Sequence, residues 1–113
     1  MPATPIDAAT FAELQATAGA DFVAELIDTF LEEAPPMIEA LRESLAAGQA
    51  EGFRRAAHSL KSNAGTFGAL TLASMARELE LNGIEAARAS GALDRLAEHY
   101  ADVAAELKAL RDA

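Results

Sequence analysis

The chain has 113 residues, of which 51% are hydrophobic, and it carries a formal net charge of -9 at pH 7. This length and apolar content fit one folded domain, and the absence of cysteine excludes disulfides and thiolate-based metal or redox sites. The acidic balance argues against nucleic acid as a partner, and the lack of a secretion signal or a ~20-residue apolar span predicts a soluble, cytoplasmic protein without a membrane partner.

Ala, Leu and Glu dominate the composition and no alternating run of strand length occurs, so we expect an all-α protein. Residues 1–6 are a short lead-in, and residues 7–113 form the single domain. Apolar spacing and the positions of Gly and Pro predict six helices, at about residues 8–18, 20–33, 36–48, 49–64, 69–88 and 92–111. We expect the last four to form an antiparallel up-down four-helix bundle, with one or two additional N-terminal helices that cap or extend it.

Two of these boundaries depend on residues that disfavour helix. Pro35-Pro36 is predicted to end the second helix and begin the third, because proline is tolerated in a first turn but not in a helix interior. Asn82-Gly83 normally signals a turn. A single glycine destabilises a helix by only about 1 kcal/mol, so the fifth helix can instead continue to about Arg88.

His58 lies in the fourth predicted helix, on the face that points away from the core. At about 100° per residue, the apolar side chains of this helix lie opposite His58; they are Phe53, Ala56, Leu60, Ala64 and Phe67. The residues on the same face as His58 are charged, polar or small: Glu51, Arg54, Arg55, Lys61, Ser62 and Gly65. The spacing therefore predicts an exposed histidine rather than a core residue.

The charge around His58 differs from that of the rest of the chain. Residues 1–41 contain eight acids and no base, whereas residues 52–77 contain four bases and no acid. A basic surface around an exposed imidazole suits a phosphoryl group or an acidic partner. Lys61 lies one turn beyond His58, and the small residues Ser62 and Gly65 let a partner's backbone approach the imidazole closely.

This segment resembles the histidine-containing phosphotransfer (HPt) domain of two-component phosphorelays. The family pattern is His-x-Leu-Lys-Gly with a second glycine ten residues after the histidine, and His58, Leu60, Lys61 and Gly68 occupy those positions. An upstream stretch from Phe30 to Pro35 and a downstream Leu79-Glu80 pair extend the resemblance to about residues 20–110. Ser62 stands where the family usually has glycine, which leaves the role of His58 intact.

The resemblance implies a stoichiometric phosphocarrier without an ATP site. His58 would accept a phosphoryl group from an aspartyl phosphate in the receiver domain of a hybrid histidine kinase, and pass it to an Asp of a response regulator. Lys61 would stabilise the phosphoryl group, while Glu80 is interpreted as a charge at the surface or the edge of the bundle. The residues expected to contact the receiver are Arg54, Arg55, Ser62, Gly65 and Gly68.

The resemblance also implies that the chain itself holds no cofactor or metal, since the Mg²⁺ of the reaction belongs to the receiver domain. A monomer is expected because the His58 face must stay free, while a dimer through the acidic N-terminal helices stays open. Two alternatives remain open. The chain could be the phospho-accepting domain of a chemotaxis-type kinase, whose own catalytic domain would be the donor, or a non-catalytic helical adaptor that binds receiver domains. A general hydrolase is excluded because no set of nucleophile, base and orienting group occurs.

Overall fold

The computed structural model describes residues 4–113 and contains five α-helices and no strand in that range. The helices are α1 (Ala8–Ala18), α2 (Ala20–Ala47), α3 (Ala50–Thr66), α4 (Leu70–Ser90) and α5 (Ala92–Asp112). Over the same residues, none of the helices combines the length and the apolar character that crossing a membrane requires.

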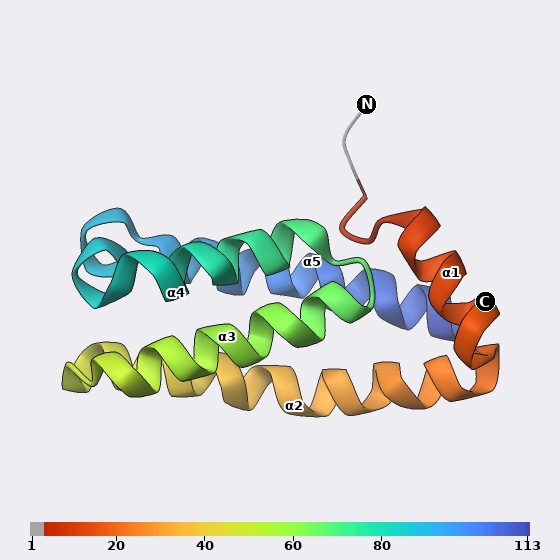
Figure 1. Ribbon diagram of the computed structural model, residues 1–113, viewed down its shortest axis with the longest axis horizontal. Coiled ribbons are helices and arrows are strands. Elements are labelled where there is room, and N and C mark those ends of the chain that lie inside the picture. The colour runs from red at the N-terminus through yellow and green to blue at the C-terminus, as the bar shows by residue number, and fades with distance from the viewer. Residues whose placement is uncertain (1–3) are drawn as a thin grey trace.

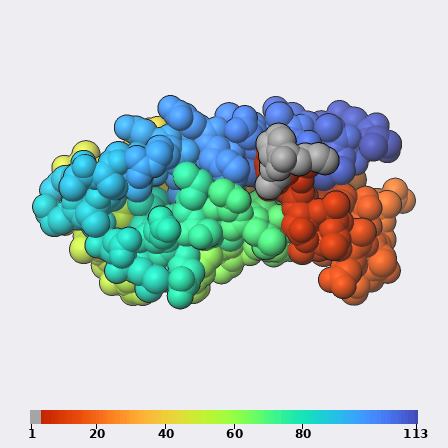
Figure 2. Space-filling model, turned by 90° about the horizontal axis from the view of Figure 1, so that it is seen from above, coloured from red at the N-terminus to blue at the C-terminus, as the bar shows by residue number. Residues whose placement is uncertain are grey.

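The four long helices α2 to α5 form a bundle in which successive helices run in opposite directions (Figure 1). α3 packs against α2 and α4, and α5 packs against the same two helices, which closes the ring. α1 contacts α2 and lies across the end of the bundle where the chain also ends (Figure 1). Figure 2 shows the face made by α4 and α5, with α1 beside it at that end. The predicted all-α bundle with an additional N-terminal helix is confirmed.

Burial along α3 fixes which way its other face points. The buried residues of this helix and of the turn that follows it are Phe53, Ala57, Leu60, Ala64 and Phe67. This agrees with the predicted stripe except that Ala57 is fully buried and Ala56 is only partly so. Each large apolar side chain buried in this way contributes roughly 1.5–3 kcal/mol relative to its exposed state, so the rotation of α3 about its own axis is strongly determined.

The prediction that Pro35-Pro36 separates two helices is wrong, because α2 continues through both prolines. Both proline side chains are exposed, while Ala34 and Ile38 on either side of them are buried. The buried line of α2 passes the prolines without a change of period, through Val23, Ile27, Phe30, Ala34, Ile38, Leu41 and Ser44. An interior proline costs a helix about 3 kcal/mol, and the burial of this line outweighs that cost. Water can also solvate the carbonyls freed on the exposed side.

The fifth predicted helix does continue through Asn82-Gly83, as α4, but with a kink. Gly83 has φ 82° and ψ -177°, which is not helical, and the helix resumes after it and ends at Ser90. Glycine tolerates a positive φ that other residues rarely adopt. The turn signal and the continuing helix are therefore both present. Glu80 lies in the last turn before the kink.

Gly68 connects α3 to α4 in a buried position against the N-terminal segment. Its φ is 81°, and a Cβ atom built on it would lie 2.9 Å from the Cβ of Thr10 and 3.0 Å from the backbone oxygen of Asp7. The carbonyl of Gly68 accepts a hydrogen bond of 2.8 Å from the backbone N–H of Asp7. Ile6 is buried in the core, so the packed part of the chain already includes residue 6 of the predicted lead-in. Residues 1–3 of that lead-in lie outside the described residues.

The Gly68→Ala substitution is expected to destabilise the protein by about 2 kcal/mol, because it combines a strained positive φ with a steric contact. Urea unfolding monitored by circular dichroism measures this change. Gly65→Ala is the matched control: Gly65 is helical and a Cβ there meets nothing within 4 Å, so alanine should stabilise by up to about 1 kcal/mol. Equal unfolding free energies for the two variants would contradict the packing described for Gly68.

Candidate functional site

His58 is exposed on α3, as predicted from the spacing. Its side chain is 56% exposed, whereas Leu60 and Ala64 on the opposite side of the helix are fully buried. Because burial of the opposite face determines how α3 is rotated, the imidazole is presented to the exterior without any local distortion of the helix. The position is suited to a group that must meet a second protein.

Glu80 of α4 connects His58 to Lys61, a contact between two helices that spacing along the sequence does not reveal. Its Oε2 lies 2.7 Å from Nδ1 of His58, and its Oε1 accepts a hydrogen bond of 2.9 Å from Nζ of Lys61. The Glu80 side chain is only 12% exposed. The interpretation of Glu80 as a surface or bundle-edge charge is therefore incomplete: it lies at the α3–α4 edge, but as the shared partner of two site residues. The Leu79-Glu80 pair in the family pattern was the signal that could have revealed it.

Both neighbours stabilise the charged form of the Glu80 carboxyl. The hydrogen bond from Lys61 and, next, the hydrogen bond with His58 lower the pKa of Glu80 below its ordinary value, while partial burial acts in the opposite direction. An ionised carboxylate can only accept hydrogen bonds, so Nδ1 of neutral His58 carries the ring proton. This leaves Nε2 as the imidazole nitrogen with a free lone pair.

This lowered pKa predicts a pH-dependent contribution to stability. The contribution is fully present above the ordinary glutamate pKa of about 4.3 and is lost as the pH falls through the lowered pKa of the folded state. The melting temperature of Glu80→Gln should therefore lie below that of the wild type at pH 7, and the two melting temperatures should converge in acid. Thermal unfolding from pH 7 to pH 3 measures this, and a difference that persists unchanged at pH 3 would contradict it.

The Hpt domain family model matches residues 25–113 of the chain. The chain belongs to the Hpt domain family. It is also similar to the crystal structure of histidine-containing phosphotransfer protein B (HptB) from Pseudomonas aeruginosa PAO1, with a TM-score of 0.88 and 29% identity over 98% of this chain and 97% of that chain. No curated protein matches the sequence significantly. Helix α1 precedes the residues that the family model matches, but it falls within the length covered by the match to HptB.

Because the chain belongs to the Hpt family, it is a phosphotransfer intermediate of two-component signalling. Hpt domains are phosphocarriers rather than kinases, and their partners are receiver domains. Within residues 4–113, the structure contains no group of three or more His, Asp or Glu side chains arranged to hold a metal ion.

Arg54 and Arg55 of this Hpt domain lie on the exposed part of α3, each beside Glu51. Arg54 forms an ion pair with Glu51, and the nearest Arg55 nitrogen is 3.9 Å from the same carboxylate. The hydrogen bonds that Arg54 donates to Glu51 raise the pKa of Arg54, and the more distant Glu80 adds to this effect. Exposed pairs of this kind contribute about 1 kcal/mol or less, so both guanidinium groups can exchange Glu51 for a partner's carboxylate.

The three small residues predicted to contact a partner occupy different environments. Ser62 is exposed, and its backbone oxygen accepts a hydrogen bond from the Thr66 hydroxyl. Gly65 has open space where a side chain would be, so it remains available for close approach. Gly68 is buried against Asp7 and Thr10. Its assignment as a partner contact is therefore not supported, because close packing inside the domain explains the need for glycine.

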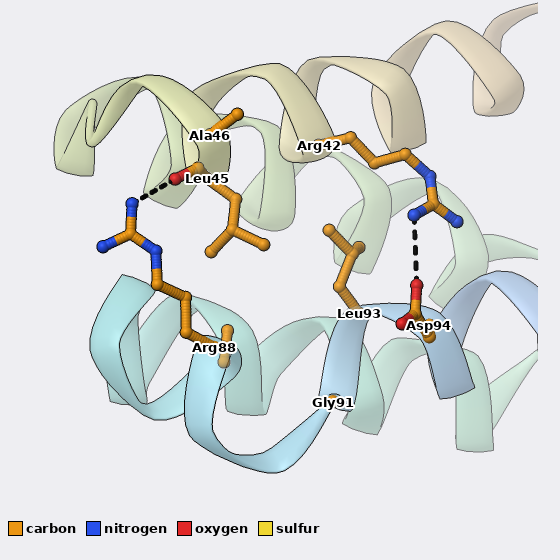
Figure 3. A pocket seen from close by; sticks show the side chains of 8 residues that line it. Arg42, Leu45, Ala46, Arg88, Gly91, Leu93 and Asp94 are labelled. Carbon is orange, nitrogen blue, oxygen red and sulfur yellow. Dashed lines mark hydrogen bonds and ion pairs between the residues drawn. The ribbon is translucent and has the colours of Figure 1, made fainter.

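A cleft of about 390 Å³ lies between α2 and the α4–α5 connection, and it contains none of the predicted site residues. Arg42 pairs with Asp94 across it at 3.1 Å, and Arg88 donates to the backbone oxygen of Leu45 near the end of α2 (Figure 3). A cation at the C-terminal end of a helix is favourable because it satisfies exposed carbonyls. These contacts join three helices and account for both arginines structurally.

Proposed function

We propose that Nε2 of His58 carries the phosphoryl group of this Hpt domain. It would accept the group from an aspartyl phosphate in the receiver domain of a hybrid histidine kinase, and donate it to an Asp of a response regulator. The observation that carries this proposal is the contact between Nδ1 of exposed His58 and Glu80. This contact supports the proposal because a carboxylate beside Nδ1 favours the tautomer with the ring proton on Nδ1, which leaves the lone pair of Nε2 free to attack.

In the accepting step, the lone pair of Nε2 attacks phosphorus while the bond from phosphorus to the aspartyl oxygen breaks. The aspartate leaves as a carboxylate with that electron pair. The imidazole keeps its Nδ1 proton and becomes positively charged, and the adjacent Glu80 carboxylate, 2.7 Å from Nδ1, stabilises that charge. The donating step is the reverse, with a second receiver's Asp as the nucleophile.

Lys61 is placed to neutralise the phosphoryl oxygens in this proposal. Its ammonium already contacts the carboxylate that holds His58, and its side chain is 29% exposed. In the phosphorylated state the ammonium would be shared between Glu80 and the phosphoryl oxygens. Arg54 and Arg55 would meet the acidic rim of the receiver, and the small residues Ser62 and Gly65 would leave room for it.

No cofactor or ATP site is proposed for this chain. The Mg²⁺ that neutralises charge during transfer would be bound by the partner receiver domain, and the carrier would act as a cytoplasmic monomer whose His58 face stays free. Both partners would use the same face in turn, because each must bring its Asp to the same Nε2 atom.

The proposal is tested by incubating the protein with a panel of purified receiver-bearing histidine kinases from the same source, ATP and Mg²⁺. The expected result is an acid-labile, alkali-stable phosphate on this chain. Each active kinase is also assayed without its receiver domain, and the label should then disappear. A label that persists would make the kinase catalytic domain the donor, as in a chemotaxis-type kinase. If no active kinase in a complete panel labels the chain, the relay proposal is wrong and a receiver-binding adaptor remains.

A further inference from the structure

Arg77 lies on α4, three residues before Glu80, which contacts the His58 site on α3. α3 and α4 run antiparallel (Figure 1), and Glu80 lies opposite His58. A residue three positions earlier on α4 is displaced by about 4.5 Å along the helix axis, toward the C-terminal end of α3. This places Arg77 level with Lys61, and its side chain is exposed.

Among the four bases of residues 52–77, Arg77 differs in its pairing. Arg54 pairs with Glu51 and Lys61 with Glu80, and Arg55 lies at the edge of ion-pair distance from Glu51. For Arg77 the structure shows no ion pair with any acid of residues 4–113. Its charge is thus not neutralised locally, although the whole chain carries a net charge of -9.

We propose that Arg77 is a docking residue for the acidic surface around the aspartyl phosphate of the receiver domain, an inference that rests on the proposed function. A protein of net negative charge repels an acidic partner at long range, so an unpaired guanidinium beside the acceptor would steer the partner toward His58. Guanidinium groups bind carboxylates in a bidentate manner. Gly65, on the neighbouring part of α3, has open space where a side chain would otherwise obstruct that approach.

Arg77 is assigned to the partner rather than to the phosphoryl group because Lys61, and not Arg77, shares a hydrogen-bonding partner with the acceptor His58. His58 and Lys61 each contact one oxygen of the Glu80 carboxylate. Arg77 forms no hydrogen bond or ion pair with that carboxylate in the structure. Docking of the receiver and stabilisation of the phosphoryl group can be distinguished with a phosphoryl donor that has no protein surface. Phosphoramidate is such a donor, since it transfers its phosphoryl group to an imidazole nitrogen with ammonia as the leaving group.

The experiment measures phosphorylation of the wild type, Arg77→Ala, Arg77→Lys and Lys108→Ala from a phosphorylated receiver and from phosphoramidate. Lys108 is the matched control, because it is exposed and unpaired within residues 4–113 but lies on α5. With the receiver at low salt, Arg77→Ala should lower kcat/KM about fivefold through KM, and Arg77→Lys less. The defect should shrink in high salt, and the phosphoramidate rate and the Lys108→Ala rates should stay at the wild-type level.

Three results would overturn the inference. If Arg77→Ala matches Lys108→Ala with the receiver, Arg77 does not contribute to docking. If Arg77→Ala is equally slow with both donors, the guanidinium acts on the phosphoryl group and not on the partner. If the receiver fails to phosphorylate the wild type while phosphoramidate succeeds, the proposed function itself is wrong and the docking role falls with it.

Discussion

The His58→Gln variant is expected to take up no phosphoryl group from any receiver that labels the wild type. Glutamine places an amide at this position, and an amide nitrogen has no lone pair available for attack on phosphorus. The loss should be complete within detection. Since the His58 side chain is 56% exposed, the free energy of unfolding should change by only about 0.5 kcal/mol or less. Labelling assays and urea unfolding of the same preparation measure the two quantities.

His99 provides the matched control, because it is the other histidine of the chain. It lies on α5 and is partly buried, with its Nε2 atom enclosed and without a hydrogen-bond partner among the described residues. We expect His99→Gln to be labelled as strongly as the wild type. A label that survives in His58→Gln and vanishes in His99→Gln would move the acceptor to α5 and remove the basis for the mechanism.

Removing the Glu80 carboxylate is expected to slow phosphoryl transfer onto His58 about 100-fold in the Glu80→Ala variant. Alanine removes both the group that holds the ring proton on Nδ1 and the negative charge that stabilises the cationic imidazole. The Glu80→Gln variant should lie between Glu80→Ala and the wild type. Its amide oxygen can still accept a hydrogen bond from the Nδ1–H group, but the amide carries no charge. Single-turnover transfer from a phosphorylated receiver measures these rates.

A purely structural role for Glu80 is distinguished by the state of the imidazole. Nitrogen-15 spectra of the unphosphorylated protein should show the Nδ1–H form of neutral His58 in the wild type and in Glu80→Gln, and a mixture of both tautomers in Glu80→Ala. Circular dichroism should show a folded protein in all three. If Glu80→Ala shows mixed tautomers but transfers at the wild-type rate, the positioning role assigned to Glu80 is wrong.

The sequence by itself determined the helical class, the family and the face of α3 on which His58 lies. Each of these depends on local spacing. Phe53, Leu60 and Ala64 recur at the period of a helix, so their burial places His58 on the opposite, exposed side. The motif from His58 to Gly68 lies within α3 and the turn that follows it, and no distant contact is needed to recognise it.

The tertiary structure alone decided the continuity of α2, the environment of Gly68 and the partner of His58. Local propensity places a break at Pro35-Pro36, but burial of the residues on both sides against neighbouring helices outweighs it. Gly68 is buried because α1 folds back onto it. Glu80 is 22 positions from His58 along the chain. The helical period places Glu80 beside the buried face of α4. Only the packing of α3 against α4 determines that His58 is the side chain that Glu80 contacts.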